Sequence, residues 1–158
     1  MSRLMVADFY YGAVLSMLFN NGIEPALIDA NENRQVYDFI TNQGECRFFV
    51  KYRADKQNTK KSDYSSWVFN LSADIDKLQQ YIDEGFNLNL ALVCGAANLV
   101  ESELVVLDKE QISQILNLEK TSITISRKKG EKAYRIPTEG GRESGIKVKY
   151  KRFEELFN

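Results

Sequence analysis

The sequence contains no histidine, and this absence removes several classes of enzyme mechanism. Ser-His-Asp and Cys-His catalysis need an imidazole, and many structural zinc sites combine cysteine with histidine. Cys46 and Cys94 are far apart and lie in apolar stretches, so we expect two buried thiols rather than a disulfide or a zinc site. An enzyme built on this chain has to use carboxylates, lysines, tyrosines or a carboxylate-bound metal.

Long apolar runs are also absent. No segment approaches the roughly 20 apolar residues that cross a bilayer, and the first residues show no signal-peptide pattern. We therefore expect a cytoplasmic protein without membrane contact. The length of 158 residues, with 44% hydrophobic and 27% charged residues, fits one globular domain over residues 1–158.

The net charge of −1 hides an asymmetry along the chain. Residues 1–120 carry 11 basic and 17 acidic side chains, whereas residues 121–158 carry 10 basic and 5 acidic ones. Two interpretations stay open for the basic end. It could form a polyanion-binding edge, or an antiparallel sheet whose solvent face and edge carry lysines that block aggregation.

Residue periodicity predicts an α/β fold with a mixed central sheet flanked by helices and a β-rich, basic C-terminal extension. Helices are predicted over residues 6–18, 72–84 and 109–116. Strands are predicted over residues 25–28, 35–41, 46–53, 67–69, 88–94, 104–107, 122–126, 133–136 and 146–150. Residues 54–65 and 140–145 are expected to be loops.

The start of the second helix carries a capping pattern. We expect Ser72 to cap it, with Asp74 and Asp76 in its first turn, where the helix dipole favours carboxylates.

The most informative segment is the predicted hairpin that carries Tyr37-Asp38-Phe39 on one strand and Phe49-Val50-Lys51 on the next. With the order of elements around it, this hairpin resembles the PD-(D/E)xK, or restriction-endonuclease-like, superfamily over residues 6–107. Members place an aspartate beside a (D/E)-x-K triplet on the neighbouring strand. The resemblance implies a nuclease-like core over residues 1–107, to which residues 108–158 add a helix and antiparallel strands.

Carried over to this chain, the resemblance makes Asp38 a catalytic residue and Mg²⁺ ligand, and Lys51 the catalytic lysine. Residues two apart on a strand share a face, so an acid and a lysine at this spacing project together. The second acidic position of the motif is occupied by Phe49, which offers no oxygen to a metal. The alternative for Asp38 and Lys51 is an ion pair across the hairpin.

Other carboxylates could replace the missing one. Glu45 has the right parity, but about 20 Å of strand separates it from Lys51. Asp8, Glu24 and Asp29 lie before the hairpin and remain candidates.

Basic residues on and after the second hairpin strand predict phosphate contacts. The candidates are Arg47, Lys51, Arg53, Lys56, Lys60 and Lys61. Tyrosines at positions 52 and 64 could support them by stacking on bases. The alternative is a solvated loop without a ligand.

Two functions follow from these patterns. The first is a nuclease-like domain that engages nucleic acid, with an incomplete or non-standard catalytic site. The second is a non-enzymatic factor, of the mobile-element or anti-defence type, that binds a protein partner through an acidic surface over residues 70–110.

Overall fold

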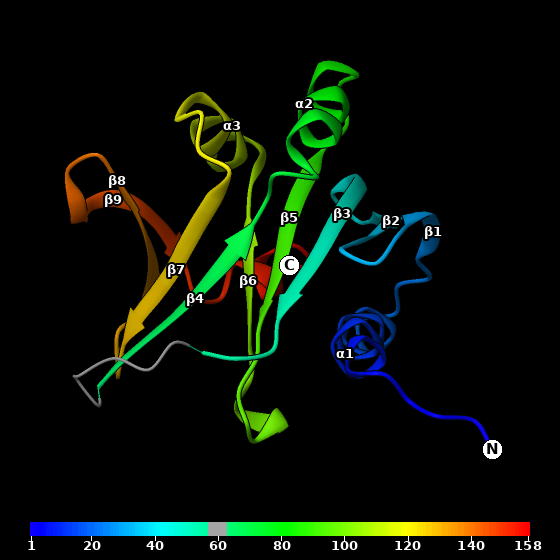
Figure 1. Ribbon diagram of the computed structural model, residues 1–158. Helices are drawn as coiled ribbons and strands as arrows, with labels where there is room; N and C mark the ends of the chain where they lie inside the picture. Colours follow the sequence, from blue (N-terminus) through cyan, green and yellow to red (C-terminus); the bar gives the residue numbers. More distant parts are fainter. Residues whose placement is uncertain (57–62) are drawn as a thin grey trace.

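The computed structural model describes residues 1–56 and 63–158, without the side chains of residues 142 and 143, and these residues form two β-sheets and four α-helices (Figure 1). Sheet A has the order β1 (Ala26–Ala30), β2 (Gln35–Thr41), β3 (Gly44–Arg53), β5 (Leu88–Cys94) and β6 (Glu103–Leu107). Sheet B has the order β4 (Tyr64–Asn70), β7 (Ser122–Lys128), β8 (Ala133–Thr138) and β9 (Gly141–Lys149). Strands β3 and β5 are parallel and the other pairs are antiparallel, so the predicted α/β class and mixed sheet are confirmed.

Sheet A is covered on both faces. One face packs against α1 (Val6–Asn20) and α4 (Arg152–Glu155), and the other packs against sheet B, α2 (Ile75–Asp83) and α3 (Lys109–Asn117). Alternation along β3 divides the two cores: Phe48 and Val50 point to the α1 side, while Phe49 points to the sheet B side. The central strand β5 is buried along its whole length, as its continuous apolar pattern predicts.

Strand β4, which follows β3 in the chain, pairs with a strand of the C-terminal part. Only residues 67–69 were expected to be extended, yet β4 covers residues 64–70 and pairs with β7 along its full length (Figure 1). Trp67 and its partner Ile125 both enter the core between the sheets. At the same interface, Glu103 of β6 accepts hydrogen bonds from Arg127 Nε and the Tyr134 hydroxyl, each at 2.8 Å. The basic C-terminal strands therefore form one layer of a sandwich.

Several local predictions are confirmed. Helix α3 begins after Asp108, which forms a reciprocal capping box with Gln111. Both cysteines are free and buried.

A short 3₁₀ helix, η1 (Leu99–Glu101), precedes β6. Within the described part of the chain, no helix has the length and apolar character needed to cross a membrane.

Two local predictions are wrong. Ser72 does not cap α2: its backbone N–H donates to the Asn70 side chain, and Asp74 occupies the N-cap position without a capping hydrogen bond. Residues 140–145 are not a loose loop, because β9 begins at Gly141, whose φ of 87° closes a tight β8–β9 turn. The four-residue helix α4 was not predicted.

Candidate functional site

The predicted pair of Asp38 and Lys51 lies on one face of sheet A, but the two side chains do not meet. The β2–β3 register places Asp38 directly opposite Arg47. Lys51 lies four residues further along β3, which corresponds to roughly 13 Å of strand. The structure therefore divides the expected site into two separate ion-pair clusters, and an Asp38–Lys51 ion pair across the hairpin is also wrong.

Asp38 is held by Arg47 through two parallel hydrogen bonds. Arg47 Nε donates to Oδ1 at 2.6 Å and an outer guanidinium nitrogen donates to Oδ2 at 2.7 Å. Hydrogen bonding to Asp38 raises the pKa of Arg47. The guanidinium carbon also lies 3.6 Å from the centre of the Phe86 ring and 4.5 Å from that of Tyr81. Both oxygens of Asp38 are thus engaged by one buried cation.

The Asp38 cluster opens into a cleft of about 790 Å³ between the start of β1, the β2–β3 hairpin and the α2–β5 turn. Glu24, Glu45 and Glu84 line this cleft together with Asp38. Among the described residues, however, no three aspartate, glutamate, cysteine or histidine side chains converge as ligands of one metal ion. Since Arg47 occupies both oxygens of Asp38, these residues do not fit the Mg²⁺ that the resemblance implies.

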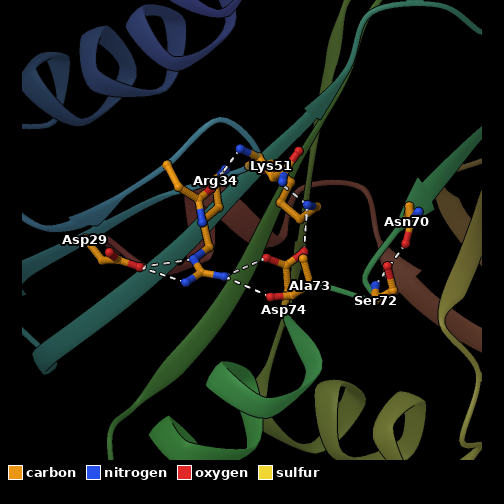
Figure 2. Close-up of polar contacts among 9 residues, drawn as sticks. Asp29, Arg34, Lys51, Asn70, Ser72, Ala73 and Asp74 are labelled. Atoms are coloured by element: carbon orange, nitrogen blue, oxygen red, sulfur yellow. Dashed lines mark hydrogen bonds and ion pairs between the residues drawn. The ribbon is translucent and has the colours of Figure 1, made fainter.

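Lys51 is buried and paired with Asp74, the N-cap residue of α2 (Figure 2). Its Nζ lies 2.7 Å from Asp74 Oδ2 and donates to the Asn33 carbonyl at 3.1 Å. A hollow of about 360 Å³ borders Lys51 and Arg53, but only 8% of the Lys51 side chain is exposed. The ammonium therefore neutralises Asp74 and is largely shielded from solvent.

Arg34 completes a network of four alternating charges (Figure 2). It donates to Asp74 Oδ1 and to Asp29 Oδ2, each at 3.0 Å, and to the Ala73 carbonyl at 3.1 Å. Burial lowers the pKa of Arg34, but its hydrogen bonds to the two aspartates outweigh this effect and raise it. With two cations and two carboxylates the network is neutral, as a buried cluster requires.

The sequence pattern missed this network for a physical reason. Asp74 was assigned to the dipole of α2, and its partners on β3 and before β2 are remote in sequence. The sequence did contain one signal for Arg34. The short turn between β2 and β3 sets a register in which Gln35 pairs with Val50. One residue further from the turn, the same register places Arg34 beside Lys51.

The predicted phosphate contacts are only partly on the surface. Arg53 and Lys56 are exposed at the end of β3 and just beyond it, whereas Arg47 and Lys51 are buried in ion pairs. Lys60 and Lys61 lie outside the described residues.

A second basic region lies on the solvent face of sheet B. Its side chains are Lys128, Arg135, Lys147 and Lys149, and we call it the basic sheet face. The register pairs Arg135 with Lys147 on adjacent strands, and their neighbours Ile136 and Val148 point to the opposite, buried face. The three lysines are exposed. Arg135 pairs with Glu131 at 3.5 Å, and Lys149 lies 3.7 Å from Glu155 while its side chain remains 75% exposed.

Comparison of the chain with family models, curated proteins and solved structures found no match.

Proposed function

We propose that this domain binds nucleic acid through phosphate contacts and does not cleave it. The observation that carries the proposal is the basic sheet face, where exposed lysines stand on β7 and β9 around a central arginine. Lys147 and Lys149 are about 7 Å apart along one strand, so the positive charge is spread over an extended surface. A spread of this kind suits a polyanion better than a single small anion.

The geometry supports binding better than cleavage. A metal-dependent nuclease needs free carboxylate oxygens and a lysine that reaches the substrate. Here Arg47 occupies the oxygens of Asp38, Asp74 neutralises Lys51, and Phe49 replaces the second acid. The side chains at the motif positions therefore stabilise the fold.

The connectivity of sheet A supports a restriction-endonuclease-like origin. Helix α1 precedes the antiparallel strands β1, β2 and β3, and α2 precedes β5, which pairs parallel to β3. This is the order of elements on which the resemblance was based. Under the proposal, the domain keeps that core and contacts nucleic acid through the second sheet.

Fluorescence anisotropy with a labelled 20-base-pair duplex tests binding. The variant combines Lys128→Gln, Lys147→Gln and Lys149→Gln, and we expect its affinity at 50 mM KCl to fall at least tenfold. The matched control combines Lys77→Gln, Lys109→Gln and Lys120→Gln on other surfaces, and should bind almost as the wild type does. A wild type that fails to bind at 50 mM KCl contradicts the proposal.

A nuclease assay in Mg²⁺ or Mn²⁺ tests the second half of the proposal. We expect no cleavage of DNA or RNA by the wild type. Cleavage that is abolished by Asp38→Asn, in a variant that remains folded by circular dichroism, would refute the non-cleaving assignment.

A further inference from the structure

Helix α1 lies on the side of sheet A away from sheet B (Figure 1), and most of its exposed residues are uncharged. Its only charged residue is Asp8, whose carboxylate accepts the Met5 backbone N–H at 2.7 Å at the start of the helix. The inner side of the helix buries Tyr10, Tyr11, Val14 and Leu18. The outer side exposes Met5, Phe9, Gly12, Ala13, Ser16 and Phe19. These outer residues carry no charge, whereas the solvent side of a surface helix usually carries charged and polar residues.

The outer face is symmetric about position 14. Phe9 and Phe19 lie five residues to either side of it, and Gly12 and Ser16 lie two residues to either side. In an antiparallel pair of identical helices centred there, each Phe9 meets a Phe19 and each Gly12 meets a Ser16. The small central residues allow the backbones to approach closely, as helix packing at the shortest interaxial distances requires. A two-fold interface demands self-complementarity of this kind.

The exposed apolar area is sufficient for such an interface. Phe9 is 48% exposed, Phe19 is 58% exposed and Met5 is 68% exposed. Leu27, 60% exposed on β1, lies on the same side of sheet A as α1 because it pairs with Tyr37, whose side chain packs in the α1 core. With side chains of this size, we estimate that each copy would bury about 500 Å² of its surface, or roughly 1,000 Å² for the two copies together. A buried area of this size is at the lower limit of a specific interface.

We infer that α1 packs antiparallel against α1 of a second copy of this chain, forming a two-fold symmetric homodimer. Asp8 is the only charged side chain of α1, and the antiparallel register about position 14 places it opposite Asn20 of the second copy, so like charges do not meet. The basic sheet faces lie on the other sheet and stay free in the dimer, so the inference is independent of the proposed nucleic-acid binding.

Sedimentation velocity between 1 and 100 µM tests the dimer. The mass obtained for the wild type should be twice the chain mass of 18.1 kDa. Gly12→Glu should reduce it to one chain mass, because two carboxylates would enter the interface. A side chain at position 12 has open space, with no atom within 4 Å of its Cβ, so this variant should fold normally. Ser16→Glu should act in the same way.

The matched control is Ser72→Glu, which adds the same charge at an exposed site before α2 and should remain dimeric. A wild type that is monomeric at 100 µM overturns the inference. So does a dimer that survives both glutamates, because a different face would then form it. A monomer that co-sediments with neutral phosphatidylcholine vesicles would overturn the inference in favour of a lipid surface.

Discussion

Removal of the Asp74 carboxylate should destabilise the protein more than any other single change in its ion pairs. The Asp74 side chain is 0% exposed, and its two oxygens contact Lys51 at 2.7 Å and Arg34 at 3.0 Å. In Asp74→Ala, Arg34 keeps Asp29, but the Lys51 ammonium loses its carboxylate partner and keeps the Asn33 carbonyl as an acceptor, in a side chain that is 8% exposed. An uncompensated buried charge of this kind costs about 3–5 kcal/mol.

Urea unfolding at pH 7 measures this cost. For a slope of about 2 kcal/mol per M, the loss lowers the midpoint by about 2 M. The double variant Lys51→Met/Asp74→Ala removes both charges and leaves Arg34 paired with Asp29, so it should recover most of the loss. The control Asp76→Ala removes an exposed carboxylate from the first turn of α2 and should cost less than about 1 kcal/mol.

The comparison of the single and double variants separates the cost of an unpaired charge from the cost of lost packing. If Asp74→Ala shifts the midpoint by less than about 0.5 M, the Lys51 ammonium is not enclosed as the structure shows. If the double variant is as unstable as the single one, the loss comes from packing and not from the unpaired charge.

Three further outcomes follow from the same geometry. Asp38→Asn should cost less than about 1.5 kcal/mol in urea unfolding, because the Asp38 side chain is 36% exposed and water can replace part of its contact with Arg47. Burial raises the pKa of Cys46 to about 12, so its contribution to stability is complete below pH 9 and is lost at about 1.4 kcal/mol per pH unit up to pH 12. In Cys46→Ala, the free energy of unfolding should decline less steeply with pH, as measured by unfolding curves at pH 8, 10 and 11. An unchanged decline would contradict the buried-thiol explanation. Gly95→Ala should lose about 1–3 kcal/mol, since its Cβ would lie 2.7 Å from two backbone carbonyl oxygens, whereas Gly12→Ala in α1 should not destabilise the chain.

The sequence predicted elements whose signals are local. Alternation marked β2 and β3, and the periodicity of residues 109–116 marked α3. The resemblance implied that Asp38 and Lys51 share one face of the sheet, and the register places them there. Their separation depends on the hairpin register, which the short β2–β3 turn sets but which the comparison with the motif did not use, so the motif looked more compact than it is.

Non-local features could not be predicted in the same way. The pairing of β4 with β7 joins segments more than 50 residues apart, and no local pattern identifies the partner. The Asp74 ion pairs are non-local as well, since they join the start of α2 to Lys51 on β3 and to Arg34, which is 40 residues away in the sequence. A sheet with lysines on its solvent face was one of the two interpretations left open for the basic end, and Lys147 and Lys149 do alternate with the inward-facing Ile146 and Val148. The structure adds that Lys128 and Arg135 from neighbouring strands share this face.

The salt dependence of duplex binding tests the central claim most directly. Each phosphate that a lysine neutralises contributes about −0.9 to the slope of log K against log[KCl]. The variant with Lys128, Lys147 and Lys149 replaced by glutamine should therefore give a slope shallower by roughly 2.7 than that of the wild type. Equal slopes for the two proteins would show that the basic sheet face does not contact nucleic acid.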